Sequence, residues 1–411
     1  MSRVIIFEDP AFKNLLPLVY WRAVFQLRCG RRDLLAKILD QLKVSNPVLF
    51  VRPELSQVVA EHVPFPVNPV LESDGEDLLL VNGRWLANGP LPVLDVNTYL
   101  LQGTTVVAAR IAATKAASIS PNNLVQPELL RSLLSDARAV AATDDIILIN
   151  YPWDLVQQNK DQIFHECRDN TKAGKVYPGA HLLAEENIHI GPGTSIKPGA
   201  ILDAEEGPIW IDENVRLLPN VVIQGPVYIG PHGLIQSSAH IREGTSLGPV
   251  CKVGGEVEDS ILQGYSNKQH YGFLGHSYLA EWINCGAGMT NSDLKNTYGA
   301  IRVSLDGVND VETGLIFVGL MVGDHTKIGI NVCFPSGAVV GTASSVITTR
   351  YPPKFVASFT WLTDDGKKDY TTDEAIKVAT RSMARRKIVM TNAQKKLFMA
   401  LPEITRKYES R

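Results

Sequence analysis

A six-residue repeat in the middle of the chain is the feature that most restricts how this sequence can fold. A branched aliphatic residue returns at every sixth position from Ile211 to Val253, a run expected by chance about once in 10⁵ starting positions. A small or β-branched residue follows four positions after each one, as at Val215 and Ala239. The period fits neither the turn of an α-helix nor the simple alternation of a strand. It predicts a parallel β-helix in which each hexapeptide forms one flat side of a triangular coil.

The repeat extends beyond this central run in both directions. In each hexapeptide we expect the aliphatic side chain to point into the coil, while Gly, Pro, Asn and Asp make the turns. An earlier pair, Ile190 and Ile196, is offset by a short insertion near 203–208. The period returns later in the chain at Ile316, Val322, Ile328, Phe334, Val340 and Val346.

The segments on either side of the repeat predict other structure. Before it, short apolar runs at 3–7, 47–51, 77–81 and 145–150 indicate strands, and the apolar spacing at 31–42 and 127–142 indicates helices. Together they predict an α/β domain with a largely parallel sheet. After the repeat, Thr371 and Thr391 each begin a capping box, and Leu397, Phe398 and Leu401 should pack the last helix on the body. We therefore divide the chain into an α/β domain (1–175), a β-helix (176–350) and a helical extension (351–411).

Composition and charge exclude several classes of function. The chain has 411 residues, with 40 Lys and Arg against 43 Asp and Glu, so its net charge of −3 provides no global field for nucleic acid or an anionic membrane. No apolar run approaches the ~20 residues that cross a bilayer, and the N-terminus lacks the pattern of a signal peptide. The five cysteines stand singly, which indicates reduced thiols, a cytoplasmic location and no zinc site.

The polar segment at 264–299, between the two repeat blocks, is the candidate for chemistry. It is rich in Asn, His, Ser and Gly, which predicts a loop leaving the rigid scaffold to carry functional side chains. His270 and His276 are its side chains that can titrate near neutral pH.

Two stretches of this segment resemble the motifs of a known family. They are His270-Tyr-Gly-Phe-Leu-Gly-His276 and Asn284-Cys-Gly-Ala-Gly288. They are similar to the His-Leu-x-Tyr-Leu-Gly-Asp and Asn-x-Gly-Ala-Gly motifs of the hexapeptide-repeat acyltransferases, with the same spacing from histidine to asparagine. The resemblance, which covers about 188–346, is to the bifunctional family that acetylates glucosamine 1-phosphate and then uridylylates it. Within it the chain looks closest to a sugar-nucleotidyltransferase-like subgroup, whose signatures are found here at 266–275 and 294–298.

The resemblance implies a fold and an activity. The fold is a nucleotidyltransferase-like, Rossmann-like α/β domain followed by a left-handed β-helix and a helical tail, assembled as a homotrimer. The activity is acyl transfer from acetyl-CoA or another acyl-CoA to an amino-sugar phosphate or nucleotide sugar, for cell-envelope precursors.

The same resemblance implies roles for individual residues. His270 would be the general base that accepts the proton of the amine. Asn284 would orient a substrate hydroxyl or the histidine, and backbone N–H groups of Gly286, Ala287 and Gly288 would bind the thioester and its oxyanion. Further substrate contacts are expected from four side chains: Arg242, Lys268, Phe273 and Asn291.

Several residues depart from the family pattern. Phe273 replaces a tyrosine and His276 an aspartate, while Glu258 and Asp259 stand where the family has basic residues. Because carboxylates repel a sugar phosphate, the acceptor could lack that phosphate, or the site could be inert.

The N-terminal domain departs further from its family. Nucleotidyltransferases of this class begin with a glycine loop that closes around phosphates, but Glu8, Asp9 and Pro10 stand in its place. Arg84 stands where the family has an aspartate that holds Mg²⁺ with the NTP. Arg22, Arg28 and Asp9 remain weak candidates for nucleotide binding.

Two functions therefore stay open. One is an acyltransferase linked to an active or degenerate nucleotidyltransferase domain. The other is a non-catalytic, trimeric scaffold or sensor that binds a nucleotide sugar.

Overall fold

The computed structural model describes residues 3–73 and 75–410, and the chain divides into two compact units. Unit 1 is built from the residues up to Leu15, from Trp21–Leu27 and from Arg32–Tyr151. Unit 2 is built from Leu16–Tyr20, from Arg28–Arg31 and from the chain that begins at Pro152. Among the described residues, no helix is both long enough and apolar enough to cross a membrane.

Unit 1 is an α/β domain around one mixed sheet. β1 (Arg3–Phe7) runs parallel to β4 (Val48–Phe50) and β5 (Leu78–Asn82), whereas β7 (Thr105–Ile111) runs antiparallel to β5 and β6 (Thr98–Gln102). The antiparallel β6–β7 hairpin makes the sheet less uniformly parallel than the sequence predicted. The spatial order of the strands is β4 (Val48–Phe50), β1 (Arg3–Phe7), β5 (Leu78–Asn82), β7 (Thr105–Ile111), β6 (Thr98–Gln102) and β8 (Arg138–Ala141).

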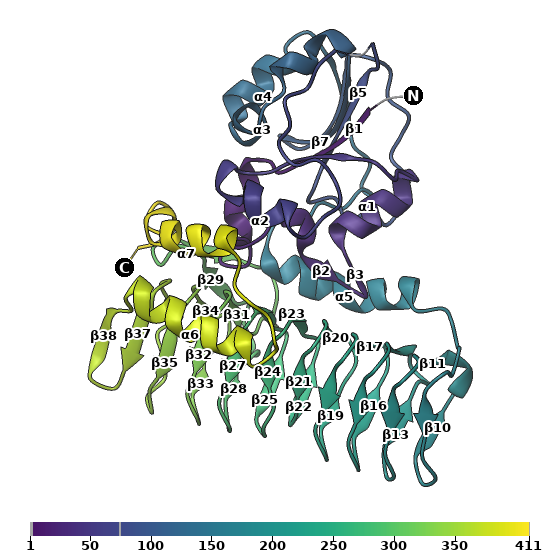
Figure 1. Ribbon diagram of the computed structural model, residues 1–411, viewed down its shortest axis with the longest axis vertical. Helices are drawn as coiled ribbons and strands as arrows, with labels where there is room; N and C mark the ends of the chain where they lie inside the picture. Colours follow the sequence, from purple (N-terminus) through teal and green to yellow (C-terminus); the bar gives the residue numbers. More distant parts are fainter. Residues whose placement is uncertain (1–2, 74, 411) are drawn as a thin grey trace. The chain divides into compact units, whose positions relative to one another are not determined.

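The helices of unit 1 are short. They are α1 (Leu34–Leu42), α2 (Ser56–Ala60), α3 (Pro121–Val125) and α4 (Pro127–Leu133). α3 and α4 lie together beside the sheet (Figure 1), where Leu124 and Leu130 join the core formed by Ile5, Phe7 and Leu80. Two predictions for this region were wrong. The run 145–150 forms only an isolated bridge at Leu148, and 127–142 ends as strand β8 rather than as one helix.

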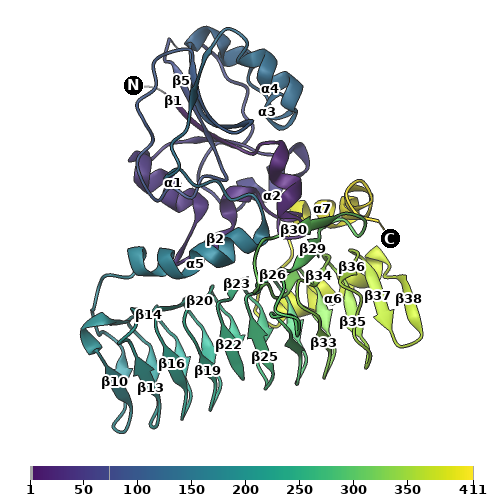
Figure 2. The same cartoon turned by 180° about the vertical axis from the view of Figure 1, so that it is seen from behind.

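Unit 2 is a β-solenoid with three faces, confirming the fold predicted from the hexapeptide repeat; its left-handed coiling stays a prediction. Figure 2 shows the coils stacked side by side from β10 (His181–Leu183) to β38 (Gly366–Asp369). The first face, here the β11 face, stacks β11 (Ile188–Ile190), β14 (Ile209–Ile211), β17 (Val227–Ile229), β20 (Thr245–Leu247), β23 (Ile261–Gly264), β26 (Tyr278–Glu281), β31 (Met321–Val322), β34 (Val339–Val340) and β36 (Phe355–Val356).

The two other faces are named in the same way. The β9 face stacks β9 (Lys175–Val176), β12 (Ser195–Ile196), β15 (Arg216–Leu217), β18 (Leu234–Ile235), β21 (Lys252–Val253), β24 (Asn267–Lys268), β27 (Asn284–Cys285), β32 (Lys327–Ile328), β35 (Ser345–Ile347), β37 (Thr360–Thr363) and β38 (Gly366–Asp369). The β10 face stacks β10 (His181–Leu183), β13 (Ile201–Asp203), β16 (Val222–Gln224), β19 (His240–Ile241), β22 (Glu256–Glu258) and β25 (Phe273–Gly275), and β28 (Thr290–Asn291) pairs with β33 (Cys333–Phe334) further along the chain.

The aliphatic residues of the repeat fill the interior of the coils. Each of the eight from Ile211 to Val253 is at most 1% exposed. Parallel pairing with the next coil satisfies the backbone on every face, with neighbouring strands ~4.8 Å apart. In the later series Val322, Phe334 and Val340 are equally buried, but Ile316 is 48% exposed because it precedes β31 in a segment outside the coils.

The remaining elements of unit 2 lie around the solenoid. A hairpin of β29 (Arg302–Ser304) and β30 (Asp310–Glu312) interrupts the coils, and the segment 351–411 contributes β36–β38 before its helices. The helices are α5 (Pro152–Glu166), α6 (Thr372–Ala384) and α7 (Asn392–Thr405). Thr371 and Thr391 cap α6 and α7, but the predicted capping box is complete only at Thr391, because the Glu374 carboxylate accepts from the Thr371 hydroxyl instead of from its backbone N–H. Leu397, Phe398 and Leu401 are buried as predicted.

Candidate functional site

The polar segment 264–291 continues the solenoid, contrary to the prediction that it leaves the scaffold as a loop. It forms β24 to β28, and the chain leaves the coils only afterwards, in the β29–β30 region. The hexapeptide pattern disappears because the inward positions of two coils carry Lys268 and Cys285 in place of aliphatic residues, in register with Val253 and Ile328.

The turn that carries His270 joins the β9 face to the β10 face. His270 is exposed, and its imidazole has no hydrogen-bond partner among the described residues. The backbone on either side is fixed, since Tyr271 O accepts from the N–H of Gly288 at 3.0 Å and the Tyr271 hydroxyl donates to Asn331 Oδ1 at 3.0 Å. The histidine turn and the Gly286–Gly288 turn of the next coil are therefore hydrogen-bonded to one another.

Lys268 supports the histidine turn from inside the coil. Its ammonium donates to the carbonyl oxygens of Gly254 (2.9 Å), His270 (2.9 Å) and Gly272 (2.5 Å). All three protons are used, so the predicted contact of Lys268 with substrate is not what this geometry favours. Burial lowers the pKa of Lys268 to about 8.

The backbone at Gly286–Gly288 leaves one N–H available. The amide of Gly286 donates to Ile328 O at 2.9 Å and that of Gly288 to Tyr271 O. Among the described residues, the N–H of Ala287 has no acceptor, while its carbonyl accepts from Asn331. Of the three amides predicted to bind an oxyanion, Ala287 alone is unused. Gly288 has φ +74°, and a side chain there would collide with Asn331 and Tyr271.

Asn284 lies on the outer surface of the β9 face. It is exposed and pairs in register with Asn267, whose Nδ2 donates to Asn284 Oδ1 at 3.3 Å. Asn267 Oδ1 in turn accepts from Nη2 of Arg386, beyond the end of α6, at 2.7 Å. The side-chain amide nitrogen of Asn284 remains available to a ligand.

The other predicted substrate contacts are engaged within the chain. Asn291 is 3% exposed and uses its amide to hold the N–H and the carbonyl of Gly275. Phe273 is half-buried, and its ring lies where a side chain at position 275 would otherwise stand.

Arg242 is surrounded by carboxylates on the β10 face. It forms an ion pair with Glu258, and its guanidinium lies 3.6 Å from Glu256 and 3.7 Å from Glu243. Its positive charge is therefore already balanced, which does not favour the predicted contact with a sugar phosphate.

A second cluster forms at the corner after the β10 face, where Asp259, His276 and Asp293 occupy successive coils. His276 Nδ1 lies 2.8 Å from Asp293 Oδ2, and its Nε2 lies 3.6 Å from Asp259 Oδ2. Its ring stacks on Phe317 with centroids 4.9 Å apart. Burial alone would lower the pKa of His276, but the hydrogen bond of Asp293 and the charges of the carboxylates outweigh it and raise the pKa above its usual value.

Part of this corner could hold a metal ion. Glu258, His276 and Asp293 each offer one ligand atom, and these atoms lie within 4.8 Å of one another. A divalent cation would have to displace both the Arg242 guanidinium from Glu258 and a proton from His276. We therefore interpret the cluster as an ion-pair network.

In unit 1, two buried ion pairs replace the expected glycine loop. The Asp9 carboxylate accepts hydrogen bonds from Arg84 Nε at 2.8 Å and from Arg84 Nη2 at 2.6 Å, and both side chains are almost inaccessible to solvent. The Glu8 carboxylate likewise forms an ion pair with Arg52, with Nε of Arg52 3.2 Å from Glu8 Oε2. The Arg84 guanidinium stands against Asp9 where a metal ion would be needed, so these residues do not fit Mg²⁺.

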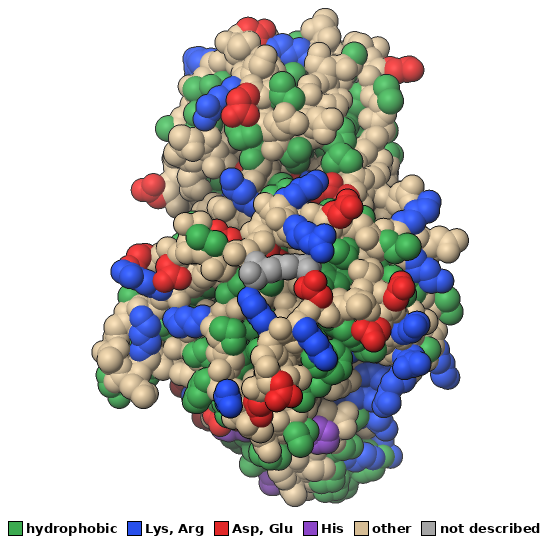
Figure 3. Space-filling model, turned by 90° about the vertical axis from the view of Figure 1, so that its left-hand side faces the viewer, with side chains coloured by type: hydrophobic (Ala, Val, Ile, Leu, Met, Phe, Trp, Pro, Cys, Tyr) green, Lys and Arg blue, Asp and Glu red, His purple; other side chains and the backbone are tan. Residues whose placement is uncertain are grey.

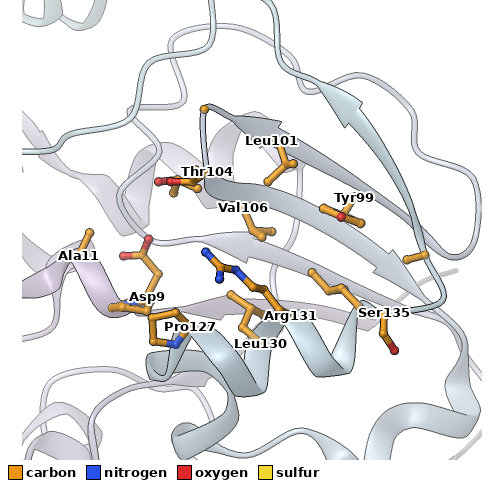
Figure 4. Close-up of a pocket in the computed structure, with 15 residues that line it drawn as sticks. Asp9, Ala11, Tyr99, Leu101, Thr104, Val106, Pro127, Leu130, Arg131 and Ser135 are labelled. Carbon is orange, nitrogen blue, oxygen red and sulfur yellow. The ribbon is translucent and has the colours of Figure 1, made fainter.

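A cavity of about 500 Å³ opens beside these residues. It lies between α4 and strands β6 and β7, and the Arg131 side chain extends from α4 toward Asp9 (Figure 4). Because Arg84 neutralises Asp9, Arg131 leaves the cavity with a net positive charge. Of the weak nucleotide-binding candidates, Asp9 lines this cavity, Arg22 is buried at 6% exposure, and Arg28 belongs to unit 2.

Sequence reasoning missed several of these functional features. Asp293 and Asn331 reach their partners His276 and Tyr271 only through the stacking of coils, and Arg386 reaches Asn267 from the end of α6. For the second cluster the sequence held one signal. Asp259, His276 and Asp293 follow one another at a spacing of 17 residues, which could have placed these three side chains on the same corner.

Comparisons with known proteins agree with the predicted resemblance. Residues 4–172 match the family model described as sugar nucleotidyl transferase. The chain is similar to the bifunctional protein GlmU of Rippkaea orientalis, with 27% identity over 165 residues, covering 39% of this chain and 30% of that protein. It is similar to the bifunctional GlmU of Acidithiobacillus ferrooxidans (30% over 176 residues; 42% and 34% covered) and of Streptococcus pyogenes (31% over 172 residues; 40% and 32% covered). The matched region spans about a third of these relatives.

Breaking the Arg84–Asp9 pair should destabilise unit 1. Arg84→Met leaves a buried, uncompensated carboxylate, so we expect the free energy of unfolding to fall by about 3–5 kcal/mol. Arg84→Met with Asp9→Leu removes both charges and should recover most of that loss. Urea unfolding followed by tryptophan fluorescence, to which the buried Trp85 contributes, measures both variants. A double variant no more stable than the single one would contradict the ion-pair interpretation.

Removing the Lys268 ammonium should loosen the histidine turn. Lys268→Met keeps the length of the side chain but leaves three carbonyls without a donor, and we expect unit 2 to lose about 3 kcal/mol of stability. Amide exchange of residues 270–272 should accelerate. The matched control is Lys367→Met at an exposed position of β38, which should change stability by less than about 0.5 kcal/mol. Unchanged exchange in the turn would rule out the supporting role.

The His276 corner should make the stability of unit 2 depend on pH. Since the pKa of His276 is raised in the folded chain, its contribution is complete below the ordinary histidine pKa of about 6.5 and is lost as the pH rises through the folded value. The difference in stability between wild type and His276→Gln should therefore shrink from pH 5.5 to pH 8.5, as measured by urea unfolding. The same substitution at the exposed His181 is the control. A difference that grows with pH would refute the assignment.

Proposed function

We propose that this chain, whose first part matches sugar nucleotidyl transferases, is an acyl-CoA-dependent N-acyltransferase for an amino-sugar derivative. The observation that carries the proposal concerns two turns that are hydrogen-bonded to one another: one carries the N–H of Ala287 and the other the exposed imidazole of His270, and neither group has a hydrogen-bond partner in the described part of the chain. A base and an oxyanion donor on adjacent, rigid coils are the two groups that acyl transfer to an amine requires.

The proposed reaction uses these groups in one displacement. The amine nitrogen attacks the thioester carbonyl as His270 accepts the amine proton, and the N–H of Ala287 donates to the developing oxyanion. The new C–N bond forms, the C–S bond breaks, and the thiolate of CoA leaves and takes up a proton. Asn284, with its free amide nitrogen, would orient the acceptor or donor beside them.

The acceptor we propose lacks a phosphate at the Arg242 position. Glu256 and Glu258 balance the Arg242 charge, so a phosphate placed there would meet carboxylates rather than a free guanidinium. Of the acceptors predicted from the resemblance, a nucleotide-linked amino sugar, with its phosphates further from the amine, fits better than an amino-sugar 1-phosphate.

A homotrimer is part of the proposal, as the resemblance implies. Tyr271 and Ile330 flank the two turns and are 66% and 70% exposed. A neighbouring copy packed on these side chains would cover them and close the site against water.

Unit 1 is proposed to bind a sugar nucleotide without transferring the nucleotidyl group. The cationic cavity beside Arg131 suits a phosphate, whereas the carboxylates Glu8 and Asp9 are held by arginines. This observation also favours the second candidate, in which the whole protein is a non-catalytic, nucleotide-sugar-binding scaffold or sensor.

CoA release distinguishes the two candidates. Across a panel of amino-sugar phosphates and nucleotide-linked amino sugars with acetyl-CoA, we expect release with at least one acceptor. His270→Gln should reduce kcat/KM by about 10²-fold or more through loss of the base, while CoA still binds. His181→Gln, on an exposed position of the same solenoid, should leave the rate unchanged. If no acceptor gives CoA release and nucleotide sugars raise the melting temperature, the acyltransferase proposal is rejected in favour of the non-catalytic scaffold or sensor.

A further inference from the structure

Four cations gather on the β9 face next to the proposed acyl site. Arg216 and Lys252 occupy the same outward position on β15 and β21, with Leu234 of β18 between them. Arg385 ends α6 as its C-cap, and Arg386 follows. Arg386 Nη2 donates to Asn267, which pairs in register with Lys252, so the end of α6 lies beside Lys252. Figure 3 shows Lys and Arg side chains grouped along one side of the lower part of the molecule.

These cations have no acidic partners among the residues that the structure describes. In the described part of the chain, none of the four forms a salt bridge with a carboxylate, although other surface cations do, as Arg302 does with Glu312. The C-terminal end of α6 supplies only about half a negative charge. The pKa of Lys252 is lowered mainly by burial, and the charges of Arg386, Arg385 and Arg216 lower it further.

Arg386 is held in place with donor capacity to spare. Its Nη2 donates to Asn267 at 2.7 Å. Its Nε is buried and out of reach of a ligand, whereas its Nη1 makes no hydrogen bond with any described residue. Asn267 is one strand from Lys252 and one strand from Asn284, in the same outward column. At ~4.8 Å a strand, Lys252 lies about 10 Å from Asn284.

We propose that Lys252, Arg385 and Arg386, with Arg216 at the margin, bind the diphosphate group of a ligand whose other end reaches Asn284. A diphosphate brings two to three negative charges and several acceptor oxygens, which matches an unpaired lysine and forked guanidinium donors. CoA and a nucleotide-linked sugar both carry this group, and both are long enough to span the distance. The proposal rests on the proposed function only for the identity of the ligand's reacting end.

The test measures binding and needs no turnover. Calorimetry on the full chain measures the affinity of inorganic pyrophosphate, CoA and UDP-N-acetylglucosamine at two salt concentrations. Lys252→Gln and Arg386→Gln should each weaken pyrophosphate binding about tenfold, and the affinity for pyrophosphate should fall as salt rises. Arg381→Gln, the same change one turn earlier on α6, is the matched control and should bind like wild type.

The two organic ligands identify the source of the diphosphate. Whichever of CoA and the nucleotide sugar loses affinity in both variants is the ligand of this site, and pyrophosphate should displace it from wild type. Unliganded Lys252→Gln should melt no lower than wild type, because the substitution removes repulsion.

Two results would overturn the proposal. One is a set of variants that bind all three ligands as wild type does, or a wild type that binds none. The other is a lower melting temperature of Lys252→Gln with unchanged binding, which would assign these cations a structural role at the end of α6. Neither result depends on whether CoA release is found, so failure of this site and failure of the proposed function are separable.

Discussion

The hydrogen-bonded register between successive coils is the constraint on which the rest of unit 2 depends. Each coil pairs with the next along its faces, so a residue at one position stands ~4.8 Å from its counterpart in the next coil. Asn267 and Asn284 meet in this way, as do the turns of His270 and Ala287. Groups far apart in sequence are thereby held within bonding distance by the backbone itself, before any side chain contributes.

What the sequence could predict follows from the same constraint. The interior of the coils accepts almost only branched aliphatic residues. The six-residue period from Ile211 to Val253 could therefore be recognised in the sequence, and it predicted the solenoid. Where Lys268 occupies an inward position, the pattern ends although the coil continues, because three backbone carbonyls satisfy the ammonium there. A pattern of apolar residues cannot reveal that substitution, and for this reason a loop was predicted in place of regular coils.

Residues of the candidate site could be predicted only where they belong to a short, local sequence motif. His270, Asn284 and Ala287 fall within two local stretches, and the structure brings the two turns together. The engagement of Arg242 by Glu258, and of Asn284 with Asn267 and Arg386, depends on pairing between coils or with a distant helix end. In unit 1 the same limit applies, since the Asp9–Arg84 pair joins residues 75 positions apart and turns a nominal metal position into a buried ion pair.

The charges on the two sides of the histidine turn differ in sign, and this difference would orient a charged ligand in the proposed site. The turn lies between the β9 face and the β10 face. On the β9 face, Lys252 and Arg386 form no salt bridge with any described carboxylate, whereas on the β10 face Glu256 and Glu258 surround Arg242. A ligand with phosphates at one end and an amine at the other would be drawn in with its phosphates on the β9 face and its amine toward the carboxylates. An amino-sugar 1-phosphate is too short to separate its charges in this way, whereas a nucleotide-linked amino sugar is not. The same asymmetry would allow CoA to occupy the cationic side, and then the acceptor would approach from the carboxylate side with its amine foremost. In the proposed reaction either arrangement would bring the amine nitrogen beside His270, and the two would differ in which substrate the cations hold.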